Sequence, residues 1–165
     1  MAEAGGYKIT LEDMDELSAV IPTITSVYPN GSADVNEFHN AGGVAAFIGS
    51  LLDGGYLFSD VQTILGDSLE VYRNKLEIKN NKLVWENPAK ILDQSIIRDS
   101  FNPFNSSGGL KLVNGNIGKG IIKTSSLTEP EAEIVAPVSV FNDQETVLEA
   151  FGTGRLNKDC IIVVR

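Results

Sequence analysis

The sequence contains one cysteine and one histidine among its 165 residues, Cys160 and His39. A single cysteine excludes an intrachain disulfide. A single histidine excludes a metal site built from several imidazoles within this chain. One thiolate cannot hold an iron–sulfur cluster by itself either, because such clusters take several cysteine ligands.

Positive charge is also scarce, since 13 Lys and Arg residues stand against 22 Asp and Glu residues and the formal net charge is -9. A nucleic-acid backbone and an anionic membrane surface both attract clustered cations, so the composition argues against both partners. A small anionic ligand stays compatible with the composition, because a few local cations or backbone amides are enough to bind one.

Long apolar runs are absent as well. The longest runs, 44–52 and 161–164, fall far short of the ~20 apolar residues that a membrane-spanning helix needs. No basic-then-apolar signal peptide opens the chain. Together with the lone cysteine, these features predict a cytoplasmic protein.

Familiar catalytic motifs are missing too. The chain has no HExxH, no CxxC and no Ser-His-Asp order, and the glycines between residues 108 and 120 have the spacing of neither a P-loop nor a dinucleotide fingerprint. Glycines at the ends of strands explain that region more simply. Cys160 precedes four apolar residues, which predicts a buried and inert thiol. The residue pattern alone therefore identifies no reaction.

The first 75 residues have helical spacing. Thr10 is a candidate N-cap for a helix that Pro22 ends. Asp34 or Ser32 is expected to cap the next helix, and Gly54 to follow the third. The further helices are expected at 34–40, 44–52 and, in a shorter form, 61–65.

From residue 76 onward the pattern changes to period two. Residues 76–85 have the signature of a hairpin around Asn80-Asn81, and a short helical turn is expected at 92–97. The sequence therefore predicts an α+β fold, with a helical segment over 1–75 and a β-rich segment over 76–165. Within the second segment, further strands are expected at 110–113, 120–124, 134–136, 138–141 and 159–164, with one helix from 143 to 151.

The segment from Tyr28 to Gly43, YPNGSADVNEFHNAGG, is dense in turn formers and polar groups. One interpretation is purely structural: a turn, a capped helix and a glycine break. The other is a polar loop and helix that face a ligand. A lone histidine such as His39 is more often a structural or surface residue than a general base, so the residues alone leave both interpretations open.

Four stretches of the chain, taken together and in order, are informative: the segment from Tyr28 to Gly43, residues 51–63 (LLDGGYLFSDVQT), residues 106–118 (SSGGLKLVNGNIG) and residues 158–164 (KDCIIVV). They resemble the family of dihydroxy-acid dehydratase and 6-phosphogluconate dehydratase, and the likeness spans nearly the whole chain. The Asn36-Glu37 pair before the histidine resembles the 6-phosphogluconate branch more than the dihydroxy-acid branch, which usually carries an acidic pair there.

The resemblance implies a fragment of a hydro-lyase that converts 6-phospho-D-gluconate to 2-keto-3-deoxy-6-phosphogluconate in the Entner–Doudoroff pathway. It implies a homodimeric parent whose iron–sulfur cluster, and Mg²⁺ in the dihydroxy-acid branch, are held by residues outside this chain. We therefore expect no cofactor and no catalytic residue here. Residues 1–75 would end, or connect from, the cluster-bearing domain, and residues 76–165 would begin a barrel-like, swivelling β/β/α domain.

Under this resemblance the polar segment becomes a candidate substrate-binding region, from which we select Asn30, Asn36 and His39. The expected partners are a sugar-acid phosphate and the rest of the parent chain. Because the chain stops in a strand-like pattern, we expect that strand to continue beyond Arg165. Two alternatives stay open: a dihydroxy-acid or other aldonic-acid dehydratase, and a non-catalytic binding domain if the gene ends at Arg165.

Overall fold

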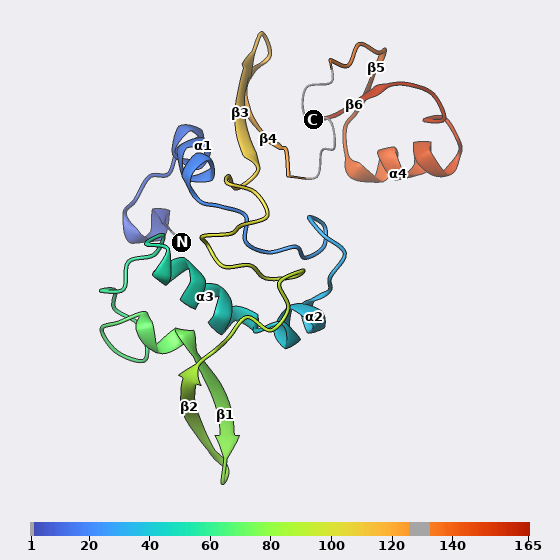
Figure 1. Ribbon diagram of the computed structural model, residues 1–165. Helices are drawn as coiled ribbons and strands as arrows, with labels where there is room; N and C mark the ends of the chain where they lie inside the picture. The colour runs from blue at the N-terminus through green and yellow to red at the C-terminus, as the bar shows by residue number, and fades with distance from the viewer. Residues whose placement is uncertain (1, 126–132) are drawn as a thin grey trace. The chain divides into compact units, whose positions relative to one another are not determined.

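The computed structural model describes residues 2–125 and 133–165 (Figure 1). Helices and strands alternate irregularly along the chain, so the fold is α+β, as the sequence predicted. No helix among the described residues is long and apolar enough to span a membrane. The elements are 3₁₀-helix η1 (Glu3–Gly5), α1 (Leu11–Val20), α2 (Val35–Asn40), α3 (Gly43–Asp53), 3₁₀-helix η2 (Glu70–Arg73), β1 (Asn74–Lys79), β2 (Lys82–Pro88), β3 (Leu110–Gly115), β4 (Gly118–Lys123), β5 (Val138–Phe141), α4 (Gln144–Gly152) and β6 (Ile161–Val164).

The chain divides into two units, Met1–Thr128 and Glu129–Arg165. The first unit contains the antiparallel pairs β1–β2 and β3–β4. In the second unit, β5 and β6 pair in parallel and α4 connects them, which makes a single βαβ element. A closed barrel needs every strand to have two hydrogen-bonded neighbours. The described strands form three separate two-stranded sheets and no closed barrel.

The helix starts follow the predicted capping chemistry. Thr10 and Asp13 cap α1 reciprocally, with the Thr10 N–H donating to Asp13 Oδ2 over 2.7 Å. Asp34, not Ser32, caps α2, and the Glu37 carboxylate accepts the Asp34 N–H over 2.8 Å. Each box satisfies backbone N–H groups that have no partner inside the helix, which fixes where the helix begins.

Two predicted elements are wrong. Residues 61–65 are not helical, because the Thr63 hydroxyl accepts the Leu65 N–H and donates to the Gly66 carbonyl, which replaces the helical hydrogen bonds with a tight local turn. The strand expected at 134–136 is also absent. Pro137 has no N–H to donate, and the ladder with β6 starts only at its carbonyl, which accepts the Ile161 N–H.

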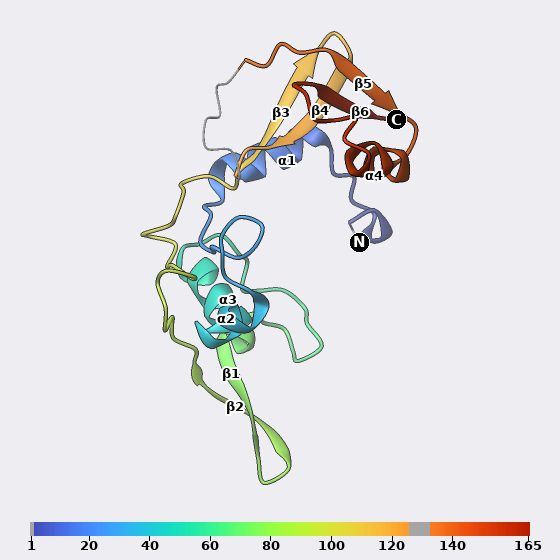
Figure 2. The ribbon, with the colours of Figure 1, turned by 90° about the vertical axis from the view of Figure 1, so that its right-hand side faces the viewer.

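The β1–β2 hairpin confirms the period-two prediction. Asn80 and Asn81 have φ of 50° and 61°, which is the conformation that a two-residue turn between twisted strands requires. In both views the hairpin extends away from helices α2 and α3 (Figures 1 and 2). At its base, Trp85 of β2 meets Tyr72 edge to face, with ring centroids 6.0 Å apart.

Helix α1 lies along β3 and β4 (Figure 2) and contacts β3 through polar groups. Asp15 Oδ1 accepts the Leu112 N–H over 2.7 Å, and Ser18 Oγ accepts the Leu110 N–H over 2.8 Å. These side chains occupy backbone donors of β3 that a further strand would otherwise take.

The apolar residues of α1 point elsewhere. Leu11, Met14, Leu17 and Val20 are 42%, 38%, 49% and 62% exposed, whereas Ser18 is the buried residue of this helix. A surface helix normally turns its apolar stripe inward. In α1 the polar stripe is docked and the apolar stripe is uncovered.

The Asp15 contact predicts an acid-sensitive stability. The hydrogen bond from the Leu112 N–H, and then that from Lys111, hold the pKa of the Asp15 carboxyl below its ordinary value, so the contact stabilises the fold above about pH 4 and is lost as the pH falls through the folded-state value. We expect Asp15→Asn to lower the stability at pH 7 and to differ less from the wild type at pH 3. Urea unfolding at both pH values measures this.

Asp60→Asn serves as the control, because the Asp60 carboxylate has no hydrogen bond within the described residues. The same loss of stability in both variants at pH 7 would mean that net charge, and not the contact with β3, sets the effect.

The core of the first unit is small. Ile24 and Ile97, at 2% and 0% exposure, are its largest fully buried side chains. They come from neighbouring segments, since the Arg98 N–H donates to the Ile24 carbonyl over 2.8 Å. Ser50 of α3 and Ser100 add a buried polar pair, in which the Ser100 N–H donates to Ser50 Oγ and the Ser100 hydroxyl to the Ser50 carbonyl, both over 2.8 Å.

Candidate functional site

The polar segment begins with a tight turn after Val27. The peptide bond between Tyr28 and Pro29 is cis. The N–H groups of Asn30 and Gly31 both donate to the Val27 carbonyl, over 2.9 and 3.1 Å. This turn leaves the Asn30 side chain exposed, and its Oδ1 accepts the Ser125 hydroxyl over 3.1 Å.

Helix α2 follows the turn and carries the other two predicted residues. The backbone N–H of Asn36 donates to the capping carboxylate of Asp34 over 2.7 Å, and the Asn36 side chain is exposed. His39 lies in the last turn of α2 and is also exposed. Neither side chain is buried.

The glycine pair between α2 and α3 makes a close contact with the chain after β2. Gly42 has φ of 131°, and Gly43, which opens α3, has φ of 62°. A side chain at Gly42 would lie 2.6 Å from the carbonyl oxygen of Lys90. Next to this contact the Leu92 N–H donates to the Ala41 carbonyl over 2.8 Å. The glycine pair therefore allows the backbone at residues 41–43 to approach the backbone at residues 90–92 closely.

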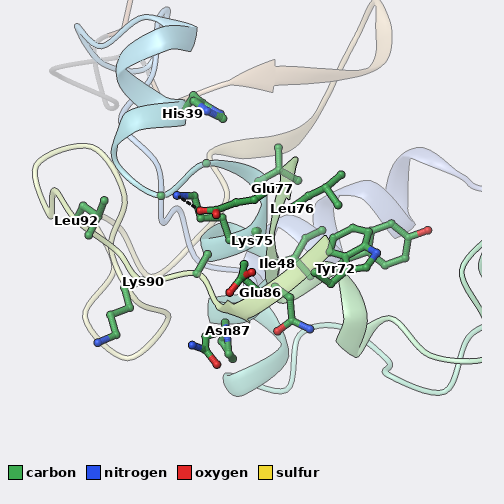
Figure 3. A pocket seen from close by; sticks show the side chains of 18 of the residues that line it. His39, Ile48, Tyr72, Lys75, Leu76, Glu77, Glu86, Asn87, Lys90 and Leu92 are labelled. Carbon is green, nitrogen blue, oxygen red and sulfur yellow. Dashed lines mark ion pairs between the residues drawn. The ribbon is translucent and has the colours of Figure 1, made fainter. Parts of the chain in front are cut away.

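A first cavity of about 810 Å³, which we call the hairpin cavity, lies between the start of α3 and the β1–β2 hairpin. His39 lies at one end of it, while Ile48 and Tyr72 lie on the opposite side from Lys90 and Leu92 (Figure 3). Aromatic and aliphatic groups make up most of the wall, with Trp85 of β2 beside Tyr72.

Charge in the hairpin cavity is largely paired. Lys75 Nζ lies 2.8 Å from Glu77 Oε1, an ion pair marked by a dashed line in Figure 3. Glu86 is engaged by Lys79. The cavity thus combines a largely apolar wall with few convergent polar groups, as small-molecule sites often do, and His39 lies at its end.

A second cavity of about 250 Å³, which we call the hydroxyl cavity, lies between the segment before the turn and the segment before β3. Among the residues that the structure describes, no Lys, Arg, Asp or Glu contributes to its wall. Its lining is almost entirely hydroxyl and amide side chains: Thr23, Thr25, Ser26, Asn30, Phe104, Asn105, Ser107, Gly109, Thr124 and Ser125.

The structure distributes the three predicted residues over different places. Asn30 lines the hydroxyl cavity and His39 lines the hairpin cavity. Asn36 lines neither. Sequence reasoning missed Thr23, Thr25 and Asn105, although the alternation of Thr23 and Thr25 in an extended stretch was a visible signal.

The donors of this chain do not fit an iron–sulfur cluster. Among residues 2–125 and 133–165, no group of three or more His, Cys, Asp and Glu side chains is arranged to hold a metal ion. Cys160 is only half-buried, less than its apolar neighbours predicted. It is the one cysteine in the sequence, whereas an iron–sulfur cluster takes several thiolates. The side chains of this chain therefore do not form a site for such a cluster.

Two domains of one family match this chain, and the match to the N-terminal domain precedes the match to the C-terminal domain along the sequence. Residues 1–78 match the dihydroxy-acid/6-phosphogluconate dehydratase N-terminal domain. Residues 95–165 match the dihydroxy-acid/6-phosphogluconate dehydratase C-terminal domain. The hydroxyl cavity draws its wall from both matched segments, whereas part of the hairpin cavity comes from the residues between them.

Curated relatives agree with this match. A phosphogluconate dehydratase of Pseudomonas aeruginosa is 43% identical over the whole chain, and that of Escherichia coli K12 is 40% identical. A dihydroxy-acid dehydratase of Clostridium novyi is 31% identical over 95% of the chain. The chain spans only 27%, 28% and 26% of the length of these three relatives. The chain belongs to the dihydroxy-acid/6-phosphogluconate dehydratase family.

Proposed function

We propose that this chain is one segment of a longer enzyme that dehydrates 6-phospho-D-gluconate to 2-keto-3-deoxy-6-phosphogluconate and water, a carbon–oxygen lyase of the Entner–Doudoroff pathway in the cytoplasm. The ordered match to the N-terminal and C-terminal domains of the family carries this proposal. The relatives named phosphogluconate dehydratase, at 40–43% identity, support that substrate over a dihydroxy acid, whose named relative is 31% identical.

The uncovered apolar surface of the first unit supports the idea that more of the enzyme packs here. The apolar stripe of α1 is exposed, and Tyr7 and Ile9 beside it are 75% and 54% exposed. Contiguous apolar patches of this kind mark interaction surfaces. We propose that the remainder of the parent chain, which makes up nearly three quarters of the length of the relatives, covers this stripe.

The cofactor sites are divided in the same way between this chain and the remainder of the parent chain. We propose that an iron–sulfur cluster, and Mg²⁺ where the enzyme uses it, are held by the remainder of the parent and not by this chain. Residues 1–75 would then adjoin the cluster-bearing domain, and residues 76–165 would form the first part of a swivelling, barrel-like domain that the missing remainder completes. The homodimeric state of the parent belongs to this proposal too.

A dihydroxy-acid or other aldonic-acid dehydratase is the second candidate, because the relative from Clostridium novyi bears that name. A non-catalytic binding domain is the third. Assays of the longer parent on 6-phosphogluconate, gluconate and 2,3-dihydroxyisovalerate separate them. We expect turnover of 6-phosphogluconate to exceed that of the other two acids at least tenfold. Faster turnover of the dihydroxy acid, or no turnover of any acid, would overturn the first candidate.

The 165-residue chain by itself is expected to be colourless and inactive. Its residues cannot assemble a cluster, so anaerobic reconstitution with iron and sulfide should leave no stoichiometric visible chromophore, and 6-phosphogluconate should remain unconverted. Absorbance spectra and a keto-acid assay measure both. A stoichiometric chromophore that survives gel filtration would contradict the proposal that the cluster is held outside this chain.

His39 is the proposed substrate-side residue at the hairpin cavity. Since its side chain is exposed, His39→Ala in the parent enzyme should change the free energy of unfolding by only about 0.5 kcal/mol, while turnover falls about tenfold, or roughly 1.4 kcal/mol of barrier. Lys82→Ala, at the exposed tip of the hairpin, is the control. Unchanged kinetics with a lowered melting temperature in His39→Ala would assign this residue a structural role instead.

A further inference from the structure

The hydroxyl cavity is built by contacts between segments far apart in the sequence. Thr23 and Asn105 form an antiparallel bridge, and the Thr23 hydroxyl donates to the Ser107 carbonyl over 2.7 Å, between residues 84 apart in sequence. The Thr124 N–H donates to the Gly109 carbonyl over 2.7 Å, which closes the wall from the end of β4. These backbone contacts make the cavity a formed feature of the fold and not a gap between loose loops.

Part of the polar lining is already engaged. Asn105 Oδ1 accepts both the N–H and the hydroxyl of Ser107, over 3.0 and 3.2 Å. Asn30 Oδ1 accepts the Ser125 hydroxyl. Both asparagines therefore use their oxygen atoms to hold the wall.

Other polar groups of the lining remain available. Within the described residues, the side-chain Nδ2 groups of Asn30 and Asn105 and the hydroxyls of Thr25, Ser26 and Thr124 have no hydrogen-bond partner. Hydroxyls both donate and accept, and amide groups donate. A cavity with several such groups close together is suited to a ligand that itself carries several hydroxyls.

The described lining residues carry no charge and include one aromatic side chain, and both features restrict the class of ligand further. No charged side chain of residues 2–125 and 133–165 lines the cavity, whereas a phosphate dianion accepts hydrogen bonds only and is usually met by Arg or Lys. Phe104 presents an apolar surface, and its ring is held by the Arg98 guanidinium, 4.2 Å from the ring centroid. Polar groups around one apolar wall match the alternating C–H and O–H groups of an acyclic polyol.

We propose that the hydroxyl cavity binds the hydroxyl-bearing carbon chain of a sugar acid, with the carboxylate and the phosphate directed away from it. This inference rests on the proposed dehydratase function and names the part of its substrate that this chain holds. Asn30 and Asn105 are the specificity residues, since their Nδ2 groups donate to substrate hydroxyls while their oxygens stay engaged with the wall.

Asparagine-to-aspartate variants test this without removing the wall contacts. Asn105→Asp and Asn30→Asp keep the acceptor oxygens but lose the donor and add a negative charge. Asn116→Asp, in the exposed turn between β3 and β4, adds the same charge away from the cavity. In the parent enzyme, we expect the KM for 6-phosphogluconate to rise at least tenfold in Asn105→Asp, with the melting temperature unchanged, and to stay constant in Asn116→Asp.

A titration of the 165-residue chain separates this inference from the proposed function. Xylitol, an uncharged polyol, should shift the amide NMR signals of Asn105 and Ser107 at millimolar concentration, inorganic phosphate should not, and Asn105→Asp should weaken xylitol binding at least fivefold. If the parent dehydrates 6-phosphogluconate but xylitol leaves these signals unmoved, or Asn105→Asp behaves like Asn116→Asp, the cavity assignment is wrong and the function stands. If the parent fails to dehydrate any sugar acid, the proposed function is wrong, whatever xylitol does.

Discussion

Gly42→Ala is expected to lower the free energy of unfolding of the first unit by about 3–5 kcal/mol, enough to leave it largely unfolded. Two costs add at this position. The φ of 131° belongs to a region that only glycine adopts readily, and the new methyl group would lie 2.6 Å from the Lys90 carbonyl oxygen and 2.7 Å from the Ala46 side chain. Neither neighbour is the free end of a long side chain, so neither can move away cheaply.

Gly55→Ala separates these two costs. Gly55 also has a positive φ, 74°, but nothing lies within 4 Å of the position that its side chain would take. We expect a loss of about 1–2 kcal/mol there, which is the backbone cost alone. Urea unfolding followed by circular dichroism measures both variants. Equal losses in the two would show that the close approach of residues 42 and 90 contributes nothing to stability.

The elements that were predicted correctly are those whose signals are local. Thr10 with Asp13, and Asn80 with Asn81, act within a few residues of themselves, so capping and turn chemistry identified the start of α1 and the β1–β2 hairpin. The failed helix at 61–65 is local too, but there the Thr63 hydroxyl competed with the helix, and apolar spacing carries no information on that competition.

The candidate site was only partly predictable, because its geometry is set by distant pairs. Asn30 was chosen for its polar neighbourhood, and it does line a polar cavity. Its companion Asn105 becomes relevant only through the bridge to Thr23, which no periodicity encodes. The same holds for α1: apolar spacing predicted the helix, but not that Asp15 and Ser18 would be the docked residues.

Ile97 also depends on a distant contact, and its replacement is expected to have the second large effect on stability. Its sequence neighbourhood predicted no more than a short helical turn, and yet it is 0% exposed. The reason is a long-range contact, since its backbone pairs with Thr25 in an isolated antiparallel bridge. Ile97→Ala is expected to lower the free energy of unfolding by about 3–4 kcal/mol, and Ile97→Val by about 1 kcal/mol, because the deletion leaves a cavity that the surroundings fill only in part.

Ile117→Ala is the matched control, since it makes the same change at a side chain that is 98% exposed, and it should alter the stability by less than about 0.5 kcal/mol. Urea unfolding of the three variants gives the comparison. In a unit whose described residues bury only Ile24 and Ile97 as large side chains completely, one of them should account for a large share of the stability. A loss in Ile97→Ala no larger than that in Ile117→Ala would mean that the packing of Ile97 does not stabilise the first unit in solution.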